Sequence, residues 1–176
     1  MHKVLLIGQA PANALGKPVI EGLSRGLLAK LSGLMEEQFL LRFEAMNVLQ
    51  AFPGKAAKKG DRFPMKKARE AATAMLPQLE GRVIVFLGRA VQKAFKQQGD
   101  AFQWGFMNIN GKLTKAAMCP HPSGINLFWN LNKNKSAGAR FFGELVKTID
   151  DMNMKGEGDG SAAAAETNSS ETIADA

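Results

Sequence analysis

The chain has 176 residues, enough for one domain with a hydrophobic core, and no apolar run approaches the ~18 residues of a membrane span. One cysteine and two histidines exclude an internal disulfide and a cysteine-bound iron–sulfur cluster, so we expect no cofactor, no metal site and a reducing, cytoplasmic setting. Six of the 16 acidic residues and one of the 23 basic ones lie from Asp151 onward, which leaves residues 1–150 with 22 basic and 10 acidic residues, a net charge of +12. Such a body favours a polyanionic partner, nucleic acid first; the alternative is a basic surface that serves only solubility.

The first predicted element is a short apolar strand over residues 3–8, and this start does not have the pattern of a signal peptide. A loop of small residues and prolines follows from Gly8 to Pro18, which lets a ligand approach the backbone closely. Helical periodicity then runs from about Val19 to Leu34. A strand, a loop and a helix form the first half of a βαβ unit. The loop carries neither of the glycine-rich nucleotide-binding motifs, so nucleotide binding is unsupported.

The second predicted strand covers Phe39 to Val48 and places Asn47 at its carboxyl end. An asparagine amide offers two donors and an acceptor, which suits the edge of a nucleobase; the alternative is a turn-forming residue. The stretch from Lys55 to Arg69 is the most basic of the chain and ends in a helix predicted over Met65 to Leu76. It predicts a contact with a phosphate backbone, and its alternative is a solvated charged face. Its basic residues are Lys55, Lys58, Lys59, Arg62, Lys66, Lys67 and Arg69.

The third strand, Gly81 to Gly88, has an all-apolar middle, which favours the centre of the sheet. A helix is predicted straight after it, from Arg89 to Gln97. Residues 100–111 indicate an irregular arm or hairpin, because aromatic residues alternate there and Asn-Gly is a hairpin turn signal. The fourth strand is predicted over Leu113 to Met118.

The last predicted element is a helix from about Ser136 to Met152. Residues 153–176 are rich in glycine, alanine, serine and acidic residues, so we expect a disordered acidic tail behind one domain over residues 1–152. The alternation of strands and helices predicts an α/β fold, with three layers (α/β/α) and a short four-stranded, mainly parallel sheet.

The most distinctive chemistry lies in residues 119–130, directly after the fourth strand. Pro120 and Pro122 restrict the backbone on either side of His121 and remove two backbone donors. His121 should therefore lie on a stiff turn at the carboxyl end of a strand, the edge where open α/β sheets bind ligands. The alternative is a rigid surface turn whose histidine only caps a neighbouring group.

Four segments, in this order, resemble the uracil-DNA glycosylase superfamily. They are the Gly-x-x-Pro loop at residues 8–11, Asn47 ahead of Pro53-Gly54, the strand end Leu87-Gly88-Arg89, and the His-Pro-Ser-Gly-Ile-Asn turn at residues 121–126. The resemblance spans about residues 3–149. It implies the superfamily's fold and a monomer without a membrane partner. It also implies a DNA glycosylase that flips uracil or a related modified pyrimidine out of DNA and hydrolyses its N-glycosidic bond.

The resemblance also implies roles for single residues. His121 would stabilise the departing base anion, and Gln9 and Glu21 complete the predicted catalytic set. The predicted substrate contacts are Gly8, Ala10, Asn47 and Phe52, with Asn47 reading the edge of uracil. Ile125 would be the apolar wedge in the DNA stack. Together with the basic stretch, this gives the predicted DNA contacts Ser123, Gly124, Ile125, Asn126, Lys58, Lys59, Arg62 and Arg89.

The first loop departs from the superfamily pattern. Gln9 and Ala10 stand where several branches have an acid or asparagine that positions the attacking water. The nearest acid is Glu21, whose alternative role is that of an acid at a helix N-terminus. Phe128 and Trp129 are interpreted as core residues beneath the His121 turn rather than as base contacts.

Three functions therefore stay open: a monofunctional glycosylase, a non-catalytic nucleic-acid-binding protein with the same fold, and an enzyme acting on free nucleosides. His121 and Asn47 favour the first function, and Gln9 and Ala10 favour the second. The basic stretch argues against the third, because a small substrate needs no phosphate track.

Overall fold

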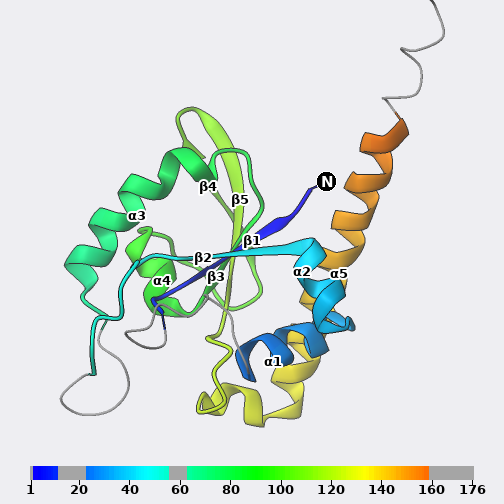
Figure 1. Ribbon diagram of the computed structural model, residues 1–176, viewed down its shortest axis with the longest axis horizontal. Helices are drawn as coiled ribbons and strands as arrows, with labels where there is room; N and C mark the ends of the chain where they lie inside the picture. Colours follow the sequence, from blue (N-terminus) through cyan, green and yellow to red (C-terminus); the bar gives the residue numbers. More distant parts are fainter. Residues whose placement is uncertain (1, 12–22, 56–62, 159–176) are drawn as a thin grey trace, which may run out of the picture.

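The computed structural model describes residues 2–11, 23–55 and 63–158, to which every structural statement below refers. These ranges alternate strands and helices along the chain (Figure 1). The elements are β1 (Val4–Gly8), α1 (Leu23–Ser32), α2 (Glu36–Arg42), β2 (Phe43–Asn47), α3 (Met65–Leu79), β3 (Ile84–Leu87), α4 (Arg89–Ala94), β4 (Trp104–Ile109), β5 (Lys112–Cys119), the short 3₁₀ helix η1 (Leu127–Asn130) and α5 (Asn132–Gly158).

A mostly parallel sheet forms the centre of the molecule, with strand order β2-β1-β3-β5-β4. β1 pairs in parallel with β2 and β3, β3 pairs in parallel with β5, and β4 runs antiparallel to β5. The described residues thus contain five strands rather than the expected four. The added strand comes from the arm at residues 100–111, which turns at Asn110 (φ 53°) and Gly111 (φ 86°), the positive φ pair that a tight hairpin requires.

Helices cover both faces of the sheet, which confirms the predicted three-layer fold. β1 shows how, since its alternate side chains enter different cores: Val4 and Leu6 face one cluster, Leu5 and Ile7 the other. Side chains from α1, α2 and α5 complete the first cluster, and side chains from α3 and α4 complete the second. Figure 1 shows these two groups of helices on opposite sides of the sheet. None of the helices in the described ranges has the length and hydropathy needed to cross a membrane.

One predicted strand is partly wrong. Residues 39–42 belong to helix α2, and the strand begins only at Phe43. The helix has Glu36 and Glu37 in its first turn and Arg42 in its last, which matches the helix dipole. Arg42 Nε also donates to Asp150 Oδ1 on α5 at 2.9 Å, which fixes the helix against that layer.

Two helices run further than predicted. α3 continues through Pro77 to Leu79. α5 begins at Asn132 and reaches Gly158, so its last six residues were wrongly included in the expected tail, while residues 159–176 lie outside the described ranges. Conversely, α4 ends at Ala94, before the predicted Gln97.

The carboxyl ends of β1, β2, β3 and β5 lie at one edge of the sheet, because Gly8 pairs with Asn47 and Leu87 pairs with Cys119. The chain leaves β1 toward β2 on one side and returns to β3 on the other. In open α/β sheets such a reversal leaves a crevice outside the carboxyl ends of the two flanking strands. The topology therefore selects the ends of β1 and β3 as the place for a ligand.

Candidate active site

A pocket of about 310 Å³ lies at this edge, and we call it the edge pocket. It contains the residues that directly follow three parallel strands: Gln9 after β1, Gly88 and Arg89 after β3, and Pro120 and His121 after β5. The remaining lining comes from Ala101, Met118, Asn126 and Phe128. The structure thus brings together Gln9, Arg89, His121 and Asn126, which are distant in the sequence and were each predicted as site residues.

Gly88 allows two of the polar side chains of this pocket, Gln9 and His121, to converge. Its φ is 108°, a conformation that side-chain-bearing residues rarely adopt. A Cβ at this position would lie 3.3 Å from His121 Cβ and 3.7 Å from Gln9 Nε2, so both side chains lie directly over the glycine. A larger residue here would fill the space between β3 and His121.

The backbone of the His121 turn is clamped from below. The His121 carbonyl accepts hydrogen bonds from Asn126 Nδ2 at 2.8 Å and from Trp129 Nε1 at 3.0 Å. Asn126 Oδ1 in turn accepts from Phe128 N at 3.1 Å and caps the 3₁₀ helix η1. The predicted stiffness of this turn therefore has a second source besides the two prolines. Both ends of the Asn126 amide make hydrogen bonds within the fold. The predicted contact of Asn126 with DNA stays a prediction.

Asn47 is buried at the end of β2, with 6% of its surface exposed. Its Oδ1 atom is buried and accepts no hydrogen bond from the described part of the chain. Its strand is fixed beside the first loop, because Val48 N donates to Gly8 O at 3.0 Å and Leu49 N donates to Gln9 O at 2.9 Å. Asn47 does not line the edge pocket itself but lies two strands away from β3, beyond β1.

The other predicted substrate contacts, Gly8, Ala10 and Phe52, do not line the edge pocket. Gly8 is buried at the end of β1, and Ala10 is half-buried after it. Phe52 is half-buried after β2, and Lys55 Nζ lies 5.6 Å from the centre of its ring. Four residues predicted for the site, Glu21, Lys58, Lys59 and Arg62, lie outside the described residues.

The tip of the turn after His121 projects into solvent. Ile125 is 84% exposed, and Gly124 beside it is exposed as well. Ser123 is half-buried, and its carbonyl accepts from Asn126 N at 3.0 Å. An apolar side chain as exposed as Ile125 does not stabilise the fold, because only apolar surface that is removed from water contributes to the free energy of folding. Its role as a wedge in the DNA stack stays a prediction.

Cys119 does not contribute a nucleophile. It is fully buried at the end of β5, and this burial raises the pKa of its thiol. Its Sγ donates to the Pro120 carbonyl at 3.3 Å. The thiol therefore stays protonated and acts as a small core residue.

The sequence reading missed the apolar walls of the pocket. Ala101 and Met118 line it beside an isolated bridge between them, which ties the start of the arm to β5. Phe128 both packs against the core and lines the pocket, whereas Trp129, at 5% exposed, is the core residue that was predicted. The sequence signal for the first two was weak, because they are ordinary apolar residues.

Comparison with curated proteins finds no match. The family model described as Uracil DNA glycosylase superfamily matches residues 1–146, more than four fifths of the chain, and covers every element up to the middle of α5. The loops that resemble this family in sequence follow β1, β2, β3 and β5 and lie at one edge of the sheet, which agrees with the family assignment. The chain belongs to the uracil-DNA glycosylase superfamily.

Proposed function

We propose that this protein is a monofunctional DNA glycosylase that hydrolyses the N-glycosidic bond of uracil or of a related modified pyrimidine in DNA. Membership of the superfamily supports a glycosylase-like activity and DNA as the partner. The observation that carries the finer proposal is the buried Asn47 Oδ1 atom, which has no donor in the described residues. Leaving such an acceptor without a donor costs about 1–3 kcal/mol, so a ligand that donates to it gains that energy on binding.

Uracil offers the hydrogen-bonding pattern that the Asn47 amide complements. Its N3–H can donate to Oδ1, and its O4 can accept from the amide nitrogen. Cytosine carries an acceptor at N3 and a donor at C4, so both contacts would become repulsive. Asn47 would therefore select uracil over cytosine by its hydrogen bonds, once the base has been flipped out of the DNA.

His121 is the proposed electrostatic catalyst. Cleavage of the bond between C1′ and the base nitrogen leaves the bonding electron pair on the base and a cation-like sugar. A donor held near the base oxygen lowers the barrier because it stabilises the negative charge as it develops. The clamp on the His121 carbonyl and the two flanking prolines restrain the backbone that carries this donor, which supports the preorganisation that such stabilisation requires.

The attacking water supplies hydroxide to C1′ and its proton to the base or to solvent. In the proposal, Glu21 and the Gln9 side chain position this water, and Phe52 stacks on the base. Ser123 and Arg89 bind phosphates, and Ile125 fills the place of the flipped base. A glutamine can orient a water molecule but cannot take its proton, so catalysis would rest mainly on the departing anion.

One observation favours a second candidate, a non-catalytic nucleic-acid-binding protein that keeps the fold. No aspartate or glutamate is among the described residues that line the edge pocket. Such a protein would bind a flipped uracil through Asn47 and hold it without hydrolysis.

Incubation of the protein with uracil-containing oligonucleotides, single- and double-stranded, separates the two candidates. Alkali treatment cuts the abasic sites that a glycosylase leaves, so strand cleavage that depends on uracil supports the proposed activity. Matched oligonucleotides with thymine or cytosine at the same position are the control. Tight binding of uracil-DNA without any release of uracil would replace the glycosylase with the binding protein.

A further inference from the structure

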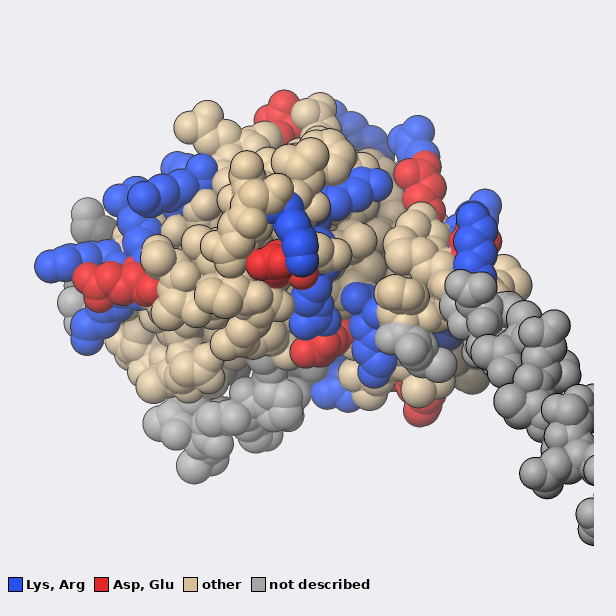
Figure 2. All heavy atoms as spheres, turned by 90° about the horizontal axis from the view of Figure 1, so that it is seen from above, with Lys and Arg blue, Asp and Glu red and all other residues tan. Residues whose placement is uncertain are grey.

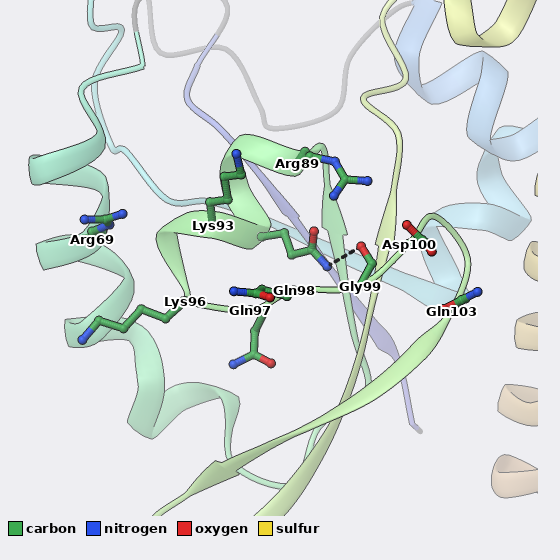
Figure 3. A pocket seen from close by; sticks show the side chains of 10 residues that line it. Arg69, Arg89, Lys93, Lys96, Gln97, Gln98, Gly99, Asp100 and Gln103 are labelled. Carbon is green, nitrogen blue, oxygen red and sulfur yellow. Dashed lines mark hydrogen bonds between the residues drawn. The ribbon is translucent and has the colours of Figure 1, made fainter.

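A wide concave surface lies next to the edge pocket. It is a groove of about 550 Å³ between α3, α4 and the loop that leads to β4, and we call it the basic groove (Figure 3). Four basic side chains line it, together with one acidic residue, Asp100: Arg69 from α3, and Arg89, Lys93 and Lys96 from α4 and its end. The groove therefore has a clear excess of positive charge.

The four cations line one groove, and none of them forms an ion pair in the described part of the chain, although four ion pairs form elsewhere in it. Arg89 and Lys93 are four residues apart on one helix, a spacing at which like charges repel. Figure 3 shows Lys96 extending from the end of α4 toward α3, the helix that carries Arg69. An anion in the groove would relieve this repulsion.

The position of Lys96 is costly for the fold. It has φ 56° directly after α4, where Gln97 N donates to Gln92 O at 3.0 Å and Lys96 N donates to Lys93 O at 3.1 Å. This is the helix ending at which glycine is the preferred residue. Lys96 lines both the basic groove and a second hollow of about 470 Å³ along α3. A lysine thus adopts a backbone conformation that favours glycine, at the position where its side chain lines both the groove and the second hollow.

The groove adjoins the edge pocket and has a fixed wall. Arg89 lines both cavities, so the groove and the edge pocket lie on either side of this one residue. The wall opposite α4 is tied by the hydrogen bond from Gln92 Nε2 to Gly99 O at 3.4 Å, which Figure 3 marks. At the end of the molecule with the β4–β5 turn, by contrast, Figure 2 shows basic and acidic side chains interspersed over a mostly uncharged surface.

From this arrangement we propose that the basic groove binds the phosphate backbone of the DNA that flanks the nucleotide in the edge pocket. The proposal rests on the proposed function for its partner, DNA, and extends the predicted phosphate contacts at Arg69 and Arg89 to Lys93 and Lys96, which the sequence did not predict as site residues. Phosphates suit the groove because lysine and arginine displace the counterions that surround DNA. The groove adds amide side chains of Gln97, Gln98 and Gln103, which can donate to phosphate oxygens.

The test is the binding of a fluorescein-labelled 20-base-pair DNA without uracil, measured by anisotropy from 50 to 400 mM NaCl. We expect Lys93→Gln with Lys96→Gln to weaken binding roughly tenfold or more at low salt. The slope of log affinity against log salt should become shallower by about two units, one for each lost phosphate contact. The control is Lys30→Gln with Lys147→Gln, which removes the same charge from exposed positions on α1 and α5. It should keep the slope of the wild type.

Lys96→Gly separates a binding effect from a folding effect. Because glycine suits φ 56°, this variant should melt no earlier than the wild type and should still lose DNA affinity. Equal slopes for the groove variant and its control would overturn the proposal. So would a groove variant that loses binding of inorganic triphosphate but keeps its DNA affinity, since the groove would then serve a small polyphosphate. Uracil plays no part in these measurements, so absence of uracil release would refute the proposed function and leave this result standing.

Discussion

At the scale of single residues, the amides of Asn47 and Asn126 have opposite environments. Asn126 uses both ends of its amide within the fold, whereas the Oδ1 of Asn47 is buried without a donor in the described residues. Replacing a satisfied amide by an apolar group removes hydrogen bonds, and replacing an unsatisfied one removes a desolvation penalty. The two residues therefore allow a matched comparison.

We expect Asn47→Leu to leave the free energy of unfolding unchanged or to raise it by about 1 kcal/mol, and to abolish uracil release. Asn126→Leu should lower the free energy of unfolding by about 2–3 kcal/mol because it leaves the His121 and Phe128 backbone groups with fewer partners. Urea unfolding of both variants checks this pair. A loss of more than ~2 kcal/mol for Asn47→Leu would mean that its amide serves the fold.

Asn47→Asp tests base reading by itself. The change turns the amide donor into an acceptor, so the contact with uracil O4 becomes repulsive while an amino group at that position can be bound. We expect a slower release of uracil and a smaller ratio between uracil and cytosine release. Single-turnover rates on the two substrates measure this ratio, and an unchanged ratio would show that another residue reads the base.

The sequence predicted where Asn47, His121 and Asn126 lie in the fold, but not how buried they are or which groups they bind. Asn47 and His121 each follow an apolar strand, which is enough to place them at one sheet edge. Burial of Asn47 Oδ1 and the internal use of Asn126 depend on which neighbours reach them across the fold. An isolated Asn-x-Phe segment does not reveal that its amide caps a 3₁₀ helix and holds a carbonyl five residues earlier.

At the scale of elements, the turn after β5 depends on the start of α5 for its support. Trp129 lies between the His121 carbonyl and Gly138 of α5, where a Cβ would come within 3.0 Å of Trp129 Cζ3. Gly138 therefore makes room for the indole that clamps the turn. Trp129 therefore connects the start of α5 to the His121 turn.

We expect Trp129→Phe to lower the free energy of unfolding by about 1–3 kcal/mol, from the lost hydrogen bond and the smaller ring, and to slow uracil release. The matched control is Trp104→Phe on β4, the same change at a half-buried ring that packs against the same core. Its hydrogen bonds in the described residues do not involve the His121 turn. Equal rates for both variants would show that the clamp does not position His121.

The sequence also shows why one element was mispredicted and one surface was missed. Phe39, Leu40 and Leu41 form an apolar run that indicates a strand, yet Leu40 and Leu41 are about half exposed on α2. A short apolar run does not separate a strand from a helix. The basic groove joins Arg69 to Lys93 and Lys96, which are more than twenty residues away, so only the packing of α3 on α4 brings them together.

At the scale of the whole molecule, charge should control how the protein meets DNA. Residues 159–176 hold four acidic residues and no basic one, so their removal raises the formal net charge from +7 to +11. We expect a chain ending at Gly158 to bind DNA about 2–10-fold more tightly at 50 mM salt, with the difference vanishing near 1 M, where the Debye length falls to about 3 Å. Identical affinities at low salt would exclude competition between these acids and DNA.

Single-turnover release of uracil by the wild type and by His121→Ala, each at saturating enzyme, is the most direct test of the proposed activity. We expect release by the wild type and a loss of roughly 10²–10³-fold in rate for the variant. DNA affinity should be nearly unchanged, because the contribution of His121 grows only as the base departs. A wild type that binds uracil-DNA without releasing uracil, or a His121→Ala variant as fast as the wild type, would contradict it.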